Sequence, residues 1–203
     1  MSAFDVLLSE LGSTIRSLPR RSLVALFWAC STALLEEFLR WAAHYHQSTE
    51  QLLRDTLNAA YKYAVFGTDP LDATRLLRSL EESSPSGESP DDFSSTAAQD
   101  CWICADVSIR VIVDPSYDAG PAIEYALEPV VSATTEELFG VSQLGSGPEL
   151  EETMSVVLEA SRVVAAVTFL RWALVFLSDE SGLSEENLAL LRSHATALTP
   201  PVS

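Results

Sequence analysis

Basic residues are scarce in this sequence, and lysine is almost missing from it. The chain has 12 Lys and Arg residues against 29 Asp and Glu residues, and Lys62 is the single lysine. The formal net charge is therefore −17. Because nucleic acids and anionic lipid surfaces are bound through clusters of basic side chains, we expect neither a nucleic-acid partner nor a membrane partner.

Long hydrophobic runs are missing as well. The longest uncharged stretch, residues 22–35, is shorter than the roughly 18 to 20 residues that span a bilayer. Residues 1–11 carry Asp5 and Glu10, and they lack the basic start and the apolar core of a signal peptide. The sequence therefore predicts a cytoplasmic protein without a transmembrane helix.

Cysteine and histidine are rare, with three residues of each. Cys101 and Cys104 form a CxxC pair inside a stretch of helical periodicity, whereas a redox cysteine gains its low pKa at a helix N-terminus. We interpret these two and Cys30 as buried, reduced thiols. His44 and His46 are two residues apart and point to different faces of a helix, and no Glu-x-x-His pair is present. We therefore expect no metal site.

Motifs of catalysis and cofactor binding are missing too. The sequence has no glycine-rich phosphate loop, no G-x-S-x-G nucleophile elbow and no H-E-x-x-H zinc motif. No catalytic residue and no cofactor is predicted. An enzyme thus has no positive support, although the sequence leaves one open.

Apolar residues recur every three or four positions through most of the chain, which is typical of amphipathic helices. With 203 residues and a hydrophobic share of 47%, the chain is long and apolar enough for one core. The pattern predicts an all-α single domain over residues 1–203, an antiparallel helical bundle or orthogonal array of seven to eight helices, with an exposed acidic loop at 83–93 and a frayed tail at 199–203. The predicted helices cover residues 3–17, 19–45, 48–66, 70–80, 94–113, 121–139, 148–178 and 184–198.

Three of these segments carry specific predictions. Residues 94–113 are apolar over most of the helix circumference and should form the central helix, although the β-branched stretch Val107–Val113 also fits a strand. One continuous apolar stripe predicts a single helix over 19–45. Another predicts a single helix over 148–178 whose inward face carries Met154, Val157, Leu158, Ser161, Val164, Ala165, Thr168, Trp172, Val175 and Phe176.

The last of these helices brings an arginine toward the core. Arg171 follows Arg162 by nine residues, or about 900° of helical rotation, so the two side chains project from nearly opposite sides. Because Arg162 marks the polar side, Arg171 should lie in the apolar face and need a carboxylate partner. Asp100 and Asp106 of the predicted central helix are the candidates, and Asp106 can also pair with Arg110 one turn away. Arg171 is then part of an internal ion pair, or it anchors a ligand in a pocket.

The order of features resembles a known family. A helix over Leu23–Tyr45 with a cysteine in its first half, a helix over Leu53–Phe66 and a third over Leu76–Glu82 precede the loop residues Pro90-Asp91-Asp92-Phe93 and the run Ala97-Ala98-Gln99-Asp100-Cys101. This resembles the bacterial YjaG-like family of unknown function, in which such a loop precedes an alanine-rich helix with an embedded Asp-Ala-Cys. Here Gln99-Asp100-Cys101 stands at that place, without the alanine. The resemblance spans about residues 23–140 and leaves the helix from Pro148 outside.

The general character of the chain is also similar to the acidic helical immunity proteins of bacterial toxin systems. Both resemblances imply an all-helical bacterial cytosolic protein, and neither supplies catalytic residues. We therefore predict a non-enzymatic protein-binding module, such as an immunity-type inhibitor of a basic toxin, because acidic clusters steer a cationic partner. The candidate face consists of Glu81, Glu82, Glu88, Asp91 and Asp92.

Two other functions stay open. The first is a small-molecule-binding or enzymatic helical protein with a pocket around Arg171 and Asp100 or Asp106. The second is a homo-oligomer that associates through the surfaces of Trp41 or Trp172.

Overall fold

The structure, a computed structural model, describes residues 2–45, 47–83, 93–140 and 148–200. These parts contain ten α-helices and no strand, so the all-α prediction is confirmed and the predicted number of helices was slightly low. The helices are α1 (Ala3–Ile15), α2 (Arg20–Ala33), α3 (Leu35–Tyr45), α4 (Gln47–Phe66), α5 (Ala73–Glu82), α6 (Phe93–Val113), α7 (Glu124–Phe139), α8 (Pro148–Glu159), α9 (Ser161–Phe176) and α10 (Glu185–Ala195). Short 3-10 helices η1 (Gly120–Ile123), η2 (Glu180–Gly182) and η3 (Thr196–Leu198) complete them.

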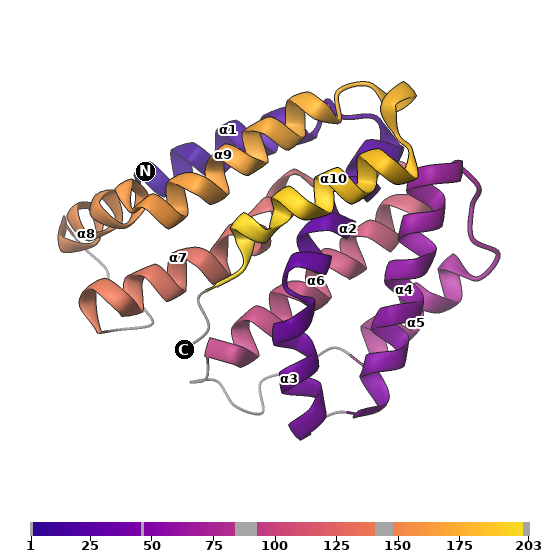
Figure 1. The fold of residues 1–203 in the computed structure, drawn as a ribbon, viewed down its shortest axis with the longest axis horizontal. Helices are drawn as coiled ribbons and strands as arrows, with labels where there is room; N and C mark the ends of the chain where they lie inside the picture. Colours follow the sequence, from indigo (N-terminus) through magenta and orange to yellow (C-terminus); the bar gives the residue numbers. More distant parts are fainter. Residues whose placement is uncertain (1, 46, 84–92, 141–147, 201–203) are drawn as a thin grey trace.

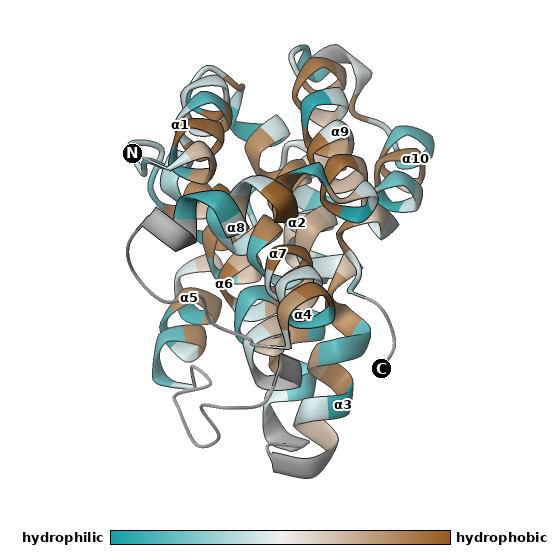
Figure 2. Ribbon diagram, turned by 90° about the vertical axis from the view of Figure 1, so that its left-hand side faces the viewer, coloured by the Kyte–Doolittle hydropathy of each residue, from teal (hydrophilic) through white to brown (hydrophobic). Residues whose placement is uncertain are grey.

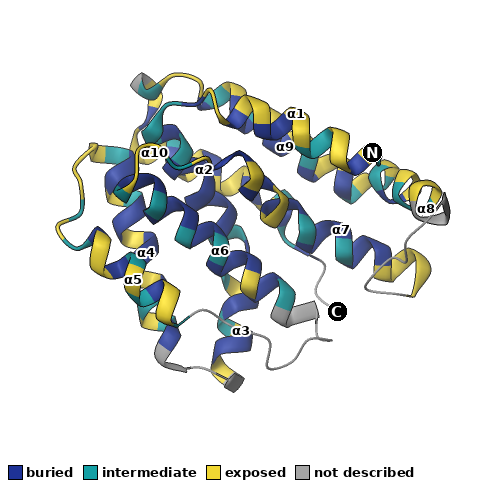
Figure 3. Ribbon diagram, turned by 180° about the vertical axis from the view of Figure 1, so that it is seen from behind, coloured by how far each residue is buried: buried dark blue, intermediate teal, exposed yellow. Residues whose placement is uncertain are grey.

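Helix α6 is the centre of the fold, as its apolar circumference predicts. It contacts α2, α3, α4, α5 and α7, and it is a helix over its whole length, including the stretch that also fitted a strand. Its side chains Trp102 and Ile109 are among the largest fully buried ones. Figure 3 shows α2 and α6 mostly buried, with the exposed residues on the surrounding helices.

The other helices cover this centre with one apolar side each. Helix α5 buries Ala73, Leu76 and Leu80 and exposes Thr74, Arg75 and Arg78, at the spacing of an amphipathic helix. Figure 2 shows the same division into hydrophobic and hydrophilic sides on several helices. Helices α1 and α9 lie side by side along one long edge of the molecule (Figure 1).

The single helix predicted over residues 19–45 is wrong, because two helices occupy this segment. Helices α2 and α3 meet at Leu34 and are bent by 52°. Leu34 itself is fully buried, and both helices pack against α6. The apolar stripe continues across the bend because both sides of it face the same core, so the spacing alone did not reveal the break.

The single helix predicted over residues 148–178 is also wrong. Ala160 has the extended backbone angles φ −62° and ψ 136°, and α8 and α9 are bent by 73° around it. An extended residue resets the direction in which the next helix presents its side chains. Residues of the predicted inward face such as Val164, Thr168 and Val175 are therefore exposed. The buried residues of α9 are Val163, Ala166, Phe169, Leu170, Ala173 and Leu174.

Among the described helices, none is by itself long and apolar enough to cross a membrane. The two bent pairs, α2 with α3 and α8 with α9, reach the required length and composition only when their members are taken together.

Candidate functional site

The structure does not form the predicted pocket around Arg171. The Nη2 atom of Arg171 lies 3.1 Å from both carboxylate oxygens of Glu10 on α1, and both side chains are more than half exposed. The bend at Ala160 causes this, because it turns the predicted inward face of α9 to the outside. Arg171 therefore joins α1 to α9 at the surface, and the prediction of an internal pair with Asp100 or Asp106 is wrong.

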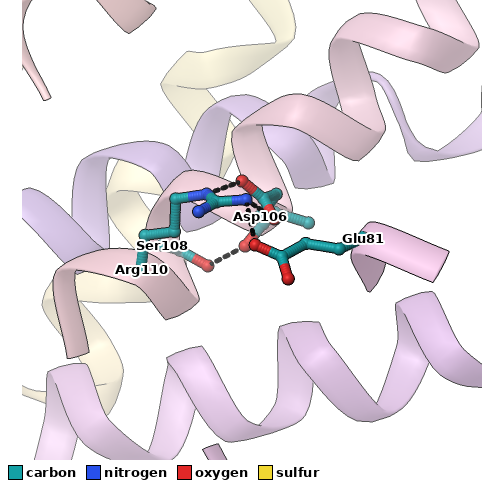
Figure 4. Close-up of polar contacts among 5 residues, drawn as sticks. Glu81, Asp106, Ser108 and Arg110 are labelled. Carbon is teal, nitrogen blue, oxygen red and sulfur yellow. Dashed lines mark hydrogen bonds and ion pairs between the residues drawn. The ribbon is translucent and has the colours of Figure 1, made fainter. Parts of the chain in front are cut away.

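Asp106 instead belongs to a charged cluster that links α5 to α6 (Figure 4). Its carboxylate accepts hydrogen bonds from Arg110 one turn away, as the sequence predicts, and Arg110 also donates to Glu81 at 2.8 Å. Burial raises the pKa of Asp106, while the hydrogen bond and charge of Arg110 act in the opposite direction. Nearby, the Ser108 hydroxyl donates to a carbonyl of its own helix, that of Ala105. The cluster is thus a structural connection between two helices.

Asp100 lies apart from this cluster and is buried with a side chain only 4% exposed. Within the described part of the chain its Oδ2 atom has no hydrogen-bond partner. Burial raises the pKa of Asp100 to about 8, and the nearby carboxylates of Glu128 and Glu124 on α7 add to the rise. A carboxyl group in this position keeps its proton near neutral pH.

The structure describes only part of the predicted partner-binding face. Glu81 and Glu82 are both exposed at the end of α5, although Glu81 is engaged with Arg110. Glu88, Asp91 and Asp92 fall outside the described residues, as does most of the predicted loop at 83–93. Trp41, one of the proposed self-association surfaces, is buried. Trp172 is partly buried; its ring stacks on Phe176 and lies tilted against His194.

The cysteines are buried and unpaired, as predicted. Burial raises the pKa of the Cys30 and Cys101 thiols to about 12 and that of Cys104 well above its usual value. The CxxC pair is therefore unsuited to redox exchange, which requires a thiolate. Across the residues that the structure describes, no three His, Cys, Asp or Glu side chains are grouped to hold a metal ion.

A groove between α2, α4 and α10 has a largely apolar lining. We call it the α2–α4–α10 groove; its volume is about 780 Å³. It is open to solvent along its length, and its lining combines apolar, hydroxyl, amide and charged side chains. The lining residues are Trp28, Thr32, Leu35, Arg54, Leu57, Asn58, Tyr61, Glu185, Ala189, Arg192, Ser193 and Thr196.

Two aromatic rings form one wall of this groove. The centroids of Trp28 and Tyr61 are 5.4 Å apart and the ring planes are tilted by 47°, a geometry that favours aromatic pairs. Trp28 is only 7% exposed, so the core holds its indole in place. The aromatic wall of the groove is therefore preformed.

The groove also gathers positive charge in a chain that has little of it. Arg54 of α4 and Arg192 of α10 both line it, and Glu185 is the one acidic residue among the described lining residues. The Nε atom of Arg54 donates to Glu50 at 2.9 Å. Arg192 forms no ion pair and no hydrogen bond with any described residue.

The sequence analysis missed this groove, although one signal pointed to it. Arg192 has Leu188, Ala189, Ala195 and Thr196 at the positions three and four residues away, so no acidic neighbour on its own helix can pair with it. The positions of Trp28, Arg54 and Arg192 in space depend on three helices far apart in the chain, which no local pattern reveals.

The fold as a whole matches that of a solved protein. A crystal structure of a DUF416 family protein from Shewanella baltica OS155 superposes with a TM-score of 0.70 at 11% sequence identity, covering 94% of this chain and 98% of that one. No family model matches the sequence, and no curated protein does either. Because only 6% of this chain lies outside the match, the shared fold includes most of α8 to α10, which the resemblance from sequence had left out. The chain therefore has the all-helical fold of a DUF416 family protein, the YjaG-like fold that its sequence resembles.

Proposed function

We propose that this chain is a non-enzymatic binding protein and that the α2–α4–α10 groove is its ligand site. The observation that carries the proposal is the groove itself, which at about 780 Å³ lies within the range of small-molecule sites of roughly 300 to 1,000 Å³. Such sites combine an apolar lining with a few polar groups that orient the ligand. Trp28, Leu57 and Tyr61 supply the apolar lining. The polar groups are Asn58 and the two arginines.

The polar side chains of the groove support binding and give no support to catalysis. The hydroxyls of Thr32, Ser193 and Thr196 donate to carbonyls of their own helices at 2.7, 2.7 and 2.9 Å. None of them is hydrogen-bonded to a histidine or a carboxylate, which is the arrangement that activates a nucleophile. The lining residues that the structure describes include no histidine and no cysteine.

A direct test fills the groove and measures binding of a neutral aromatic probe. N-phenyl-1-naphthylamine should bind the wild-type chain saturably, with a rise in probe fluorescence. Ala189 is exposed and lines the groove, so Ala189→Phe should place a ring in the hollow and abolish this binding. Ala165 is equally exposed on α9 and lies outside the groove, so Ala165→Phe is the matched control and should bind normally. Absence of saturable binding, or equal binding by both variants, would overturn the proposal.

A second candidate is the immunity-type inhibitor of a basic toxin. The observation that favours it is a pair of exposed apolar side chains at the connection between α4 and α5, where Phe66 is 61% exposed and Leu71 is fully exposed beside the acidic Asp69. Apolar anchors surrounded by acidic groups suit a cationic partner protein. Its association rate should fall steeply with salt, and Leu71→Ser should weaken the complex while Val175→Ser, on α9, should not. An association rate that does not change with salt would contradict this candidate.

A further inference from the structure

We infer that the ligand of the α2–α4–α10 groove is an organic anion: a largely apolar molecule that carries one carboxylate or a similar acidic group. The inference rests on the proposed function, since it concerns the same groove. It assigns the anionic group of the ligand to Arg192 and Arg54, and the apolar body to the wall formed by Trp28 and Tyr61.

The first argument is the state of the other arginines in the described chain. Most of them are already engaged by acidic side chains or by backbone carbonyls of the protein. The engaged arginines are Arg16, Arg20, Arg21, Arg40, Arg75, Arg110, Arg162 and Arg171. Arg192 differs from these, because it lines the α2–α4–α10 groove and forms no hydrogen bond or ion pair with a described residue.

The second argument is the convergence of two guanidinium groups from different helices. Arg54 lies on α4 and Arg192 on α10, and only packing of the two helices brings both to one groove. The Nε–H group of Arg54 donates to Glu50. The other N–H groups of Arg54 form no hydrogen bond with a described residue. A guanidinium has five N–H donors in a planar fork that matches a carboxylate, so both arginines have donors to spare.

The balance of charge in the groove selects an anion over a neutral ligand. Glu50 already pairs with Arg54, whereas Arg192 has no ion pair with any described residue, so Arg192 is the unpaired positive charge of the lining in a chain whose net charge is −17. A neutral ligand that fills the groove would remove water from Arg192 without offering it a partner, which is unfavourable. An anionic group restores that partner as a charge-assisted hydrogen bond.

Arg192 also has a structural role at the end of α10, but this role does not explain why a second arginine lies at the same groove. Arg192 lies in the last turn of α10, where a positive charge stabilises the C-terminal end of a helix. This effect acts within one helix and does not depend on a second arginine. The presence of Arg54 across the groove, beside a preformed aromatic wall, is what a ligand site requires in addition.

The test compares two probes that differ in charge. 8-Anilinonaphthalene-1-sulfonate is an aromatic anion, and N-phenyl-1-naphthylamine is its neutral counterpart. Arg192→Gln should weaken binding of the anion by roughly tenfold or more, since it removes a charged hydrogen-bond donor, and should change binding of the neutral probe by less than about twofold. Arg54→Gln should act in the same direction. Arg78→Gln is the matched control, because Arg78 on α5 also lacks a partner among the described residues and lies outside the groove.

The outcomes separate this inference from the proposed function. If Ala189→Phe leaves binding of both probes intact, the groove is no ligand site and both statements fail. If Ala189→Phe blocks the neutral probe but Arg192→Gln and Arg54→Gln leave the affinity for the anion unchanged, the groove binds ligands and the inference alone is overturned. Circular dichroism of each variant confirms that the helices are intact.

Discussion

Gly12 of α1 and Gly120 of η1 pack backbone against backbone. A Cβ atom on Gly120 would lie 2.9 Å from the carbonyl oxygen of Gly12 and 3.0 Å from the guanidinium carbon of Arg16. Arg16 is itself fixed by an ion pair of 3.0 Å to Asp118, whose carboxylate also accepts the N–H of Gly120. A stretch of α1 is thus locked to the segment that leads into α7.

We expect Gly120→Ala to destabilise the protein by about 1 to 3 kcal/mol, the typical cost of overpacking a close contact. Denaturant unfolding followed by circular dichroism measures the change. Gly182→Ala is the matched control, because its Cβ would meet only a side-chain atom at an ordinary distance of 3.6 Å. A Gly120→Ala variant as stable as the control would show that α1 can move away from η1 without loss.

Much of the fold could be predicted from the sequence because α6 and α5 follow the apolar spacing of a helix from end to end. The breaks at Leu34 and Ala160 could not be predicted, since no glycine or proline marks them. Because the break at Ala160 was missed, the predicted buried face of α9, which included Arg171, was wrong. The apolar residues of α9 surround the helix almost evenly, so the pattern gives little information on which side is buried.

The candidate groove was beyond local patterns for a different reason. Its residues are separated by up to 168 positions, from Trp28 to Thr196, and only tertiary packing brings them together. By contrast, Asp106 and Arg110 are one helical turn apart, so their spacing in the sequence was enough to predict the ion pair.

Arg21 at the start of α2 holds the end of α4. Its guanidinium donates to the carbonyls of Ala64 at 2.7 Å and Val65 at 2.6 Å, groups that have no partner within the last turn of a helix. Arg21→Gln should therefore lower the free energy of unfolding by about 1 to 3 kcal/mol, because it removes charged, partly buried hydrogen bonds to these carbonyls. Arg78→Gln, which removes the same charge from an exposed position on α5, should be nearly neutral in the same unfolding measurement.

Asp100 makes stability depend on pH. Burial raises the pKa of its carboxyl group from the usual 3.8 to about 8 in the folded chain. Between these two values the folded state keeps the proton and the unfolded state loses it, so the unfolding free energy falls as the pH rises from about 4 to about 8. Asp100→Asn removes this titration and should gain stability relative to the wild type as the pH rises, with the largest gain near pH 8.

Unfolding curves at pH 5, 6.5 and 8 test this prediction. Glu36→Gln, which removes an exposed carboxylate, is the control for the loss of one negative charge. Part of the slope should remain in Asp100→Asn, because burial also raises the pKa of Asp106. An Asp100→Asn variant with the full wild-type slope would contradict the assignment.

The three thiols should be unreactive in the folded protein. Cys30, Cys101 and Cys104 are completely buried, and burial raises the pKa of each, so that almost no thiolate forms at pH 8. We expect iodoacetamide at pH 8 to label none of them in the native state and all three in concentrated denaturant, as measured by mass spectrometry. Rapid labelling of Cys101 and Cys104 without denaturant would revive the redox interpretation of the CxxC pair.

The connection between α5 and α6 depends on Arg110. Arg110→Met leaves the carboxylate of Asp106, whose side chain is only 17% exposed, without its cation. We expect a loss of about 1 to 3 kcal/mol, with a smaller loss at pH 5 than at pH 8, because Asp106 can then take up a proton instead. Arg162→Met breaks a pair with the exposed Glu137 and should cost less than about 1 kcal/mol.

The double variant Arg110→Met with Asp106→Leu should recover stability relative to Arg110→Met alone, because no charge is left buried without a partner. If the double variant were as unstable as Arg110→Met, the loss would come from the packing of the arginine stem and not from the unpaired carboxylate.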